Sequence, residues 1–146
     1  MTSPELEELY REVILDHSRR PHGKGLLGDT PANSHQINPT CGDELTVELH
    51  LDEQSHVTSV NWDGHGCAIS QASASLLSDV AAGLTVDELT TRIGIFREAM
   101  HSRGAIAPSE ELFGDAAALA GVSRYSARVK CAMLAWVAAE QALAAA

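Results

Sequence analysis

The chain has 146 residues, of which 45% are hydrophobic and 21% are charged, a composition typical of one globular domain that folds without disulfide support. Twenty acidic and ten basic residues give a formal net charge of −10, which repels phosphate backbones and argues against nucleic-acid binding. The sequence shows no signal peptide and no apolar run near the roughly 20 residues that cross a bilayer. We therefore expect a single cytoplasmic domain over residues 1–146, without a membrane partner.

The hydrophobic pattern predicts an α+β fold. Apolar residues alternate in two stretches, as in strands with one exposed face, and elsewhere they recur at helical spacing. A stretch rich in Gly, Pro and polar residues predicts a loop with little regular structure. In chain order, the predicted elements are a helix to about Arg19, a loop over 21–38, strands over 44–51 and 56–62, a helix ending at Gly83, a helix over 85–100, a connector over 101–114, a short helix over 115–120 and a last helix from about Ser126 to the C-terminus.

Capping residues mark several of the predicted helix ends. Ser3 and Pro4 are suited to the N-cap and first positions of the first helix, and Gly83 is a natural C-terminal stop. The segment Thr85-Val86-Asp87-Glu88 has the pattern of a capping box. Ser126 is able to cap the last helix.

The chain has three cysteines, and none of them forms a CxxC pair. An odd number of cysteines in a cytosolic chain favours metal binding, catalysis or inert burial over a disulfide framework. A tetrahedral metal site built on three cysteines needs a fourth ligand of another type.

Cys41 lies between Pro39 and Gly42, just before the first predicted strand. Such a loop leaves a cysteine accessible, as reactivity requires. Asp43 follows two residues later, where its carboxylate can share a ligand sphere with the thiol. The structural alternative is a tight turn with a small buried cysteine and Asp43 as a cap.

Cys67 follows Gly64-His65-Gly66 and begins a predicted helix, where free N–H groups favour a thiolate. His65 is a further candidate ligand, but we expect it to point away from Cys67 across the turn. The alternative is a strand-to-helix turn with Cys67 in the core.

Cys131 lies early in the last predicted helix, one turn after Arg128. A cation on the same helix face favours the thiolate, whereas Lys130 should point elsewhere. The alternative is a cysteine that fills a small slot on the inner face of the helix.

All three cysteines fall at the edges of predicted elements, and such edges can converge at one end of a domain. Cys41, Cys67 and Cys131 together with the carboxylate of Asp43 form a complete tetrahedral donor set for zinc. The same thiolates suit an iron–sulfur cluster. A structural zinc domain with only an interaction role is a third possibility.

Several stretches also match a known family. They are Leu9-Tyr10, Asp16-His17, Pro21, Asn38-Pro39-Thr40-Cys41-Gly42-Asp43, Gly64-His65-Gly66-Cys67-Ala68-Ile69-Ser70-Gln71-Ala72-Ser73-Ala74-Ser75, Gly121-Val122 and Arg128-Val129-Lys130-Cys131-Ala132. In these stretches the chain resembles the SufU-type members of the IscU/NifU-like iron–sulfur cluster assembly proteins. Lys130 stands where IscU-like scaffolds carry a histidine beside the last cysteine, and the spacing of Cys67 and Cys131 leaves room for an insertion that looks SufU-like.

The resemblance implies a small antiparallel sheet with helices packed on one side. It implies zinc bound by Cys41, Asp43, Cys67 and Cys131, with Cys41 also accepting persulfide sulfur from a SufS-type cysteine desulfurase. Downstream Suf assembly proteins or apo iron–sulfur proteins would then be further partners. The alternative within the family is a scaffold on which a [2Fe–2S] cluster is assembled and passed on.

Overall fold

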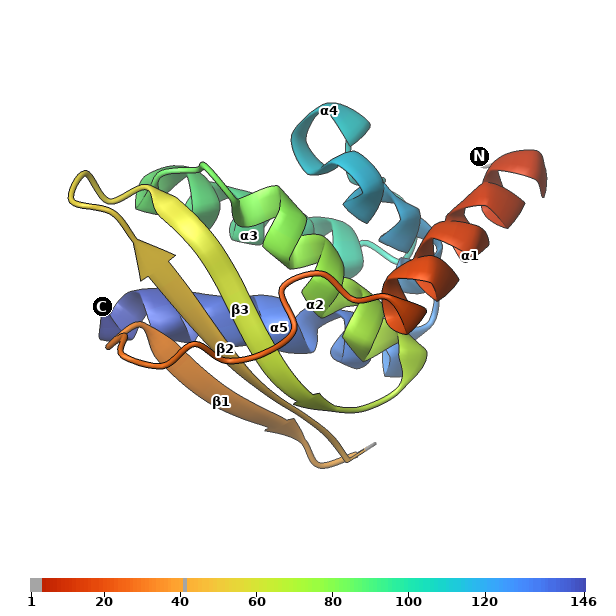
Figure 1. Ribbon diagram of the computed structural model, residues 1–146. Coiled ribbons are helices and arrows are strands. Elements are labelled where there is room, and N and C mark those ends of the chain that lie inside the picture. Colours follow the sequence, from red (N-terminus) through yellow and green to blue (C-terminus); the bar gives the residue numbers. More distant parts are fainter. Residues whose placement is uncertain (1–3, 41) are drawn as a thin grey trace.

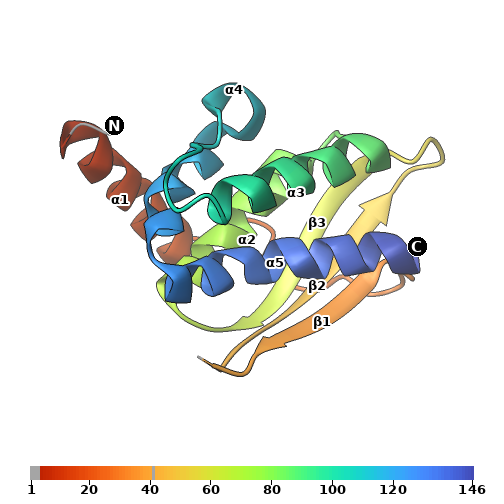
Figure 2. The same ribbon diagram turned by 180° about the vertical axis from the view of Figure 1, so that it is seen from behind.

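The computed structural model describes residues 4–40 and 42–146. Three antiparallel strands pair in the order β1-β2-β3. Their bounds are β1 Asn33–Asn38, β2 Asp43–Leu51 and β3 Val57–His65. The helices are α1 Pro4–Arg19, α2 Ala68–Ala81, α3 Val86–Met100, α4 Glu110–Phe113, the 3₁₀ helix η1 Gly114–Arg124 and α5 Ser126–Ala145. Of these, α2 and α5 make most of the contacts with the strands, and α5 lies along the back of the sheet (Figure 2). The predicted α+β class is confirmed.

The alternating pattern of β2 determines which of its side chains face the core. Leu45, Val47 and Leu49 are fully buried against the helices. The opposite face is crossed by the loop after α1, which passes in front of the sheet in Figure 1. The expectation of a wholly exposed outer face is wrong at Glu48, because this loop covers its carboxylate.

Aromatic and small side chains join the helices into one core. The Phe96 and Trp136 rings stack with centroids 4.0 Å apart. The indole N–H of Trp136 donates to Ser73 Oγ at 2.9 Å, and this hydroxyl donates to the carbonyl of Ala132 at 2.6 Å. These two hydrogen bonds fix α2 against α5, the two helices that carry Cys67 and Cys131.

Two parts of the chain differ from the sequence prediction. The expected loop over 21–38 contains β1, whose inward positions are the polar residues Ser34, Gln36 and Asn38. Without apolar alternation, this edge strand has no periodic signal. The connector expected over 101–114 contains the short α4, and the short helix expected over 115–120 is the 3₁₀ helix η1, which extends further, to Arg124.

Two of the predicted caps are confirmed, those at Gly83 and Thr85. Thr85 and Glu88 form a reciprocal capping box at α3, and Gly83 follows the C-cap of α2 with φ +86°. The N-cap position of α5 is Tyr125, which makes no side-chain capping bond, so Ser126 is not the cap. Ser3 lies outside the described residues.

None of the helices in the described ranges has the length and apolarity needed to span a membrane.

Candidate metal centre

Asp43, Cys67 and Cys131 come together at one end of the molecule. Each offers a ligand atom, and these atoms all lie within 4.8 Å of one another. Asp43 begins β2, Cys67 is the N-cap of α2, and Cys131 lies in α5. The expectation that these element ends converge is confirmed. Cys41, the fourth predicted ligand, lies outside the described residues.

The register of the sheet explains how β2 meets α2. Glu44 pairs with His65, so the first residues of β2 lie beside the last residues of β3. The chain then turns through Gly66 into α2. Sequence positions 43 and 67 are therefore neighbours because of the hairpin pairing between β2 and β3.

The Asp43 carboxylate is buried and held by two donors from the start of α2. Its Oδ1 accepts a hydrogen bond from the Cys67 backbone N–H at 3.1 Å. Its Oδ2 accepts a close hydrogen bond from Ser70 Oγ and lies 3.5 Å from Cys67 Sγ. The carboxylate is thus fixed in contact with the Cys67 sulfur.

Gly66 provides the space for this contact. A Cβ atom at position 66 would lie 2.8 Å from both Oδ1 and Cγ of Asp43, closer than real Cβ contacts allow. Glycine at position 66 leaves room for the carboxylate of Asp43, which approaches from β2.

Cys67 and Cys131 differ in exposure. Cys67 is exposed at the helix N-terminus, and its Sγ accepts a hydrogen bond from the Ser70 N–H at 3.5 Å. Cys131 is 7% exposed, and its Sγ lies 3.8 Å from the Ala127 carbonyl oxygen. Cys67 is therefore the more accessible of the two thiols.

A pocket of about 790 Å³ adjoins both cysteines, and it lies between α1, η1 and the start of α5. Arg11, Arg124 and Arg128 line it together with apolar side chains such as Ile14. The Arg128 guanidinium lies 5.4 Å from the centroid of the Tyr125 ring. The pocket therefore combines cations and apolar surface directly beside the thiols.

Tyr10 lies at the α1 side of the same pocket. Burial raises the pKa of its hydroxyl, and the nearby carboxylate of Glu110, to which it donates at 3.4 Å, raises it further. Tyr10 therefore stays a neutral hydrogen-bond donor at physiological pH.

His65, Arg128 and Lys130 lie where the sequence analysis predicts relative to the cysteines. His65 Nε2 lies 3.7 Å from Glu44 Oε2, and its side chain is 76% exposed, outside the Asp43 group. Arg128 lines the pocket with Cys131, whereas exposed Lys130 does not. The role of Ser70 could not be predicted from the sequence, because it depends on a contact with Asp43, which is distant along the chain. The one available signal is that Ser70 lies three residues after a cysteine that caps a helix.

The donor set fits a thiophilic metal. Two cysteine sulfurs and one carboxylate oxygen are suitable ligands for Zn²⁺ and leave a fourth position to be filled. Cysteine sulfurs also suit iron–sulfur clusters.

Comparisons with known proteins identify the family of this chain. The NifU-like N terminal domain family matches residues 9–132. The iron-sulfur cluster assembly scaffold protein IscU of Streptococcus pyogenes serotype M1 is 36% identical over 98% of this chain and 87% of its own length. The zinc-dependent sulfurtransferase SufU of Bacillus subtilis strain 168 is 39% identical over 95% of this chain and 92% of its own.

Solved structures give the same result for the fold. A crystal structure of the N-terminal part of a NifU-like protein from Brucella abortus superposes with a TM-score of 0.80 and 26% identity. The match covers 96% of this chain and 95% of that one. By sequence and by structure, the chain belongs to the NifU-like N-terminal domain family of iron–sulfur cluster assembly proteins.

Proposed function

We propose that this protein is a zinc-dependent sulfurtransferase that accepts persulfide sulfur on Cys41 from a SufS-type cysteine desulfurase. The observation that carries the proposal is the convergence of Asp43, Cys67 and Cys131 beside an arginine-lined pocket. The name of the Bacillus subtilis relative, a zinc-dependent sulfurtransferase, supports it. We place the protein in the cytoplasm, with downstream Suf proteins or apo iron–sulfur proteins as the recipients.

The proposed zinc ligands are Cys41, Asp43, Cys67 and Cys131. Bound zinc would keep the cysteines deprotonated at neutral pH and tie the element ends together. Asp43 is already oriented by the Cys67 N–H and Ser70 Oγ, and Cys131 is fixed within α5. These contacts support the proposal that Asp43, Cys67 and Cys131 hold the metal.

Cys41 is the proposed nucleophile because it lies in a Pro- and Gly-flanked stretch of the sequence. Its thiolate attacks the outer sulfur of the desulfurase persulfide, a new S–S bond forms on Cys41, and the S–S bond in the donor breaks. The donor cysteine leaves as a thiolate, so the exchange needs no external oxidant or reductant. The exposed arginines of the pocket offer positive charge to the approaching anionic group.

The second candidate is a scaffold that assembles a [2Fe–2S] cluster, a role supported by the name of the Streptococcus pyogenes relative. Lys130 favours the sulfurtransferase, because the lysine occupies the place of a potential histidine cluster ligand in IscU-like scaffolds.

Metal analysis of freshly purified protein separates the two candidates. We expect a colourless protein with about one zinc at the cysteine centre. Brown protein with iron and labile sulfide would instead establish the scaffold.

Sulfur transfer is tested by incubation with desulfurase and cysteine, followed by peptide mass spectrometry. We expect the added sulfur on Cys41, and we expect Cys41→Ser to lose both sulfur uptake and desulfurase stimulation. A persulfide mainly on Cys67 or Cys131, or full uptake by Cys41→Ser, would overturn the assignment. Zinc-loaded protein that leaves the desulfurase unstimulated would indicate a purely structural zinc domain.

A further inference from the structure

A second group of metal-binding side chains lies where α1 ends. It contains His17 from α1, His22 from the following loop and Asp79 from α2, and one ligand atom of each lies within 4.8 Å of the other two. None of the three lines the pocket beside Cys67 and Cys131. This group is therefore separate from the candidate metal centre.

His17 is buried in a setting that favours its neutral form, the form of an imidazole that binds metal. Burial lowers the pKa of its ring, and the nearby His22 lowers it further. Its Nδ1 lies 2.7 Å from Ser75 Oγ, a buried hydroxyl of α2. Metal-binding histidines usually donate the proton of their second ring nitrogen to such a partner, and Ser75 fills this role for a metal bound through Nε2.

Hydrogen bonds to its backbone N–H and carbonyl hold His22 in place. Its N–H donates to the same Ser75 Oγ at 2.7 Å, and its carbonyl accepts from the Trp62 indole at 2.8 Å. The next residue, Gly23, has φ +74°, and a Cβ there would lie 2.6 Å from the Val60 carbonyl oxygen. The loop is packed so closely that the His22 backbone position is fixed before any ligand arrives.

Asp79 completes the group from the solvent side. Its two carboxylate oxygens lie 2.7 Å and 3.0 Å from His22 Nδ1, and both side chains are about half exposed. Because both side chains are half exposed, they can move apart by the few tenths of an ångström that a divalent ion bound between them requires. Asp16 and Asp115 add negative charge near His17, which favours a cation.

We propose that His17, His22 and Asp79 form a second, exchangeable site for a divalent transition-metal ion such as Zn²⁺. Two imidazoles and one carboxylate that come from three segments match the ligand types such ions prefer, and the solvent side leaves room for water as a further ligand. Because two of the ligands are exposed, this site binds more weakly and exchanges faster than one built on thiolates.

The test compares zinc stoichiometry in matched variants. Each protein is dialysed to equilibrium against micromolar Zn²⁺, and bound zinc is measured by elemental analysis. We expect His22→Gln and Asp79→Asn each to bind one zinc fewer than the wild type, whatever the cysteine centre holds. The control is His56→Gln, because His56 pairs with Asp52 in an exposed turn and belongs to no three-ligand group within the described residues.

A second readout locates the ion. With the cysteine centre already loaded with zinc, added Co²⁺ should broaden the imidazole NMR signals of His17 and His22 in the wild type and leave that of His56 sharp. Equal zinc content in the wild type, His22→Gln and Asp79→Asn would overturn the proposal, as would Co²⁺ that leaves both imidazoles unchanged.

Discussion

At the scale of single residues, the arrangement of the candidate metal centre depends on close approaches between side chains and backbone. Asp43 reaches the N-terminus of α2 only because Gly66 has no Cβ, and it is oriented there by Ser70. The sequence shows a cysteine, an aspartate and several glycines. It does not show that residues 43 and 66 are in contact, because that contact is created by strand pairing.

Replacement of Asp43 tests its proposed role as a ligand. Asp43→Ala removes one donor and leaves the cysteines, so zinc affinity should fall roughly 10–100-fold, taking the loss of an outer-shell partner as a guide. Competition titration with a chromophoric chelator measures the change. Wild-type affinity in Asp43→Ala would remove this carboxylate from the ligand set.

Replacement of Gly66 offers a complementary test, because it displaces the Asp43 carboxylate without removing it. In Gly66→Ala the new methyl group would lie 2.8 Å from the carboxylate carbon, so the carboxylate must move and zinc affinity should fall. The matched control is Gly94→Ala within α3, where a Cβ meets nothing within 4 Å. This control should keep wild-type zinc affinity and gain about 1 kcal/mol in unfolding free energy.

At the scale of elements, periodic apolar patterns predicted the helices and strands that face the core. The hairpin of β2 and β3 and the helices α1, α2, α3 and α5 were visible for this reason. The edge strand β1 was not, because its inward side chains are polar and β2 provides its pairing. Short α4 and η1 have too few turns for a reliable period.

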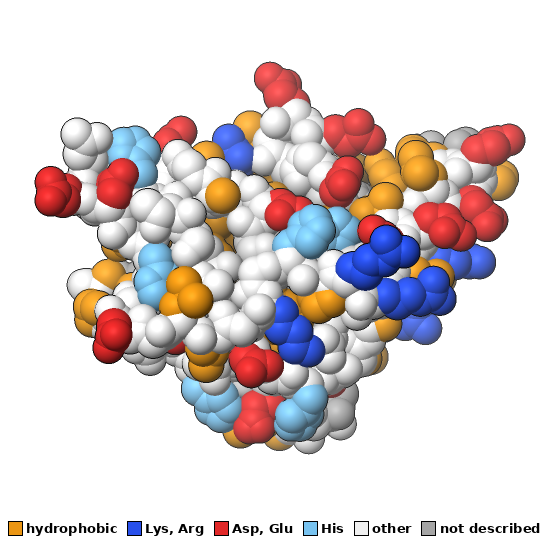
Figure 3. Space-filling model, in the orientation of Figure 1, with side chains coloured by type: hydrophobic (Ala, Val, Ile, Leu, Met, Phe, Trp, Pro, Cys, Tyr) orange, Lys and Arg blue, Asp and Glu red, His pale blue; other side chains and the backbone are white. Residues whose placement is uncertain are grey.

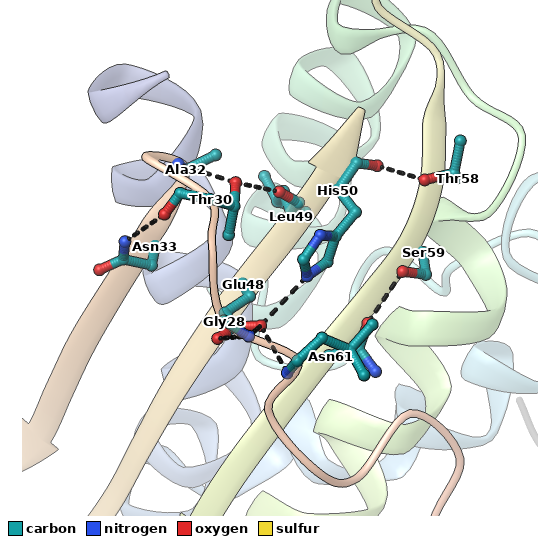
Figure 4. Close-up of polar contacts among 11 residues, drawn as sticks. Gly28, Thr30, Ala32, Asn33, Glu48, Leu49, His50, Thr58, Ser59 and Asn61 are labelled. Atoms are coloured by element: carbon teal, nitrogen blue, oxygen red, sulfur yellow. Dashed lines mark hydrogen bonds and ion pairs between the residues drawn. The ribbon is translucent and has the colours of Figure 1, made fainter. Parts of the chain in front are cut away.

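The loop over the outer face of the sheet is held by one buried carboxylate (Figure 4). Glu48 accepts hydrogen bonds from the backbone N–H groups of Leu27 at 3.0 Å and Gly28 at 3.1 Å. The neighbouring His50 ring lies 3.1 Å away. Burial alone would raise the pKa of Glu48, but the hydrogen bonds from His50, Leu27 and Gly28 outweigh it and lower the pKa below 4.5.

The lowered pKa of Glu48 predicts that the stability of the fold depends on pH. Its contribution is complete above the unfolded pKa of about 4.5 and is lost as the pH falls through the lower folded value. Glu48→Gln should cost about 1–3 kcal/mol at pH 7 and flatten the loss of stability between neutral and acidic pH. Chemical denaturation at several pH values measures this, and an unchanged acid profile in Glu48→Gln would contradict it.

At the scale of the whole molecule, the metal ligands connect segments that are distant in the sequence. The cysteine positions at element ends let the sequence predict their convergence, and the family resemblance supplied the expected chemistry of zinc and sulfur. The surrounding pocket could not be predicted, because α1 and η1 line it through tertiary packing. Lys and Arg side chains gather on the right of the view in Figure 3, where α1 lies, despite the net charge of −10.

Zinc removal should therefore affect the stability of the entire fold. A ligand at 100 times its Kd adds about 2.7 kcal/mol to the folded state, so chelation should lower the melting temperature by on the order of 10 °C. Calorimetry before and after verified zinc removal measures the shift. Full recovery on zinc addition is the control, and an unchanged melting temperature would exclude a structural contribution.

The hydrogen bond from Trp62 to His22 has a spectroscopic consequence. The chain has two tryptophans, both fully buried, and Trp136 lies instead within the core beside Phe96. A Trp136→Phe protein would therefore emit from Trp62 alone. A metal ion bound by the His22 side chain adds charge close to this single indole, so the protein carries its own fluorescent reporter for metal binding at the end of α1.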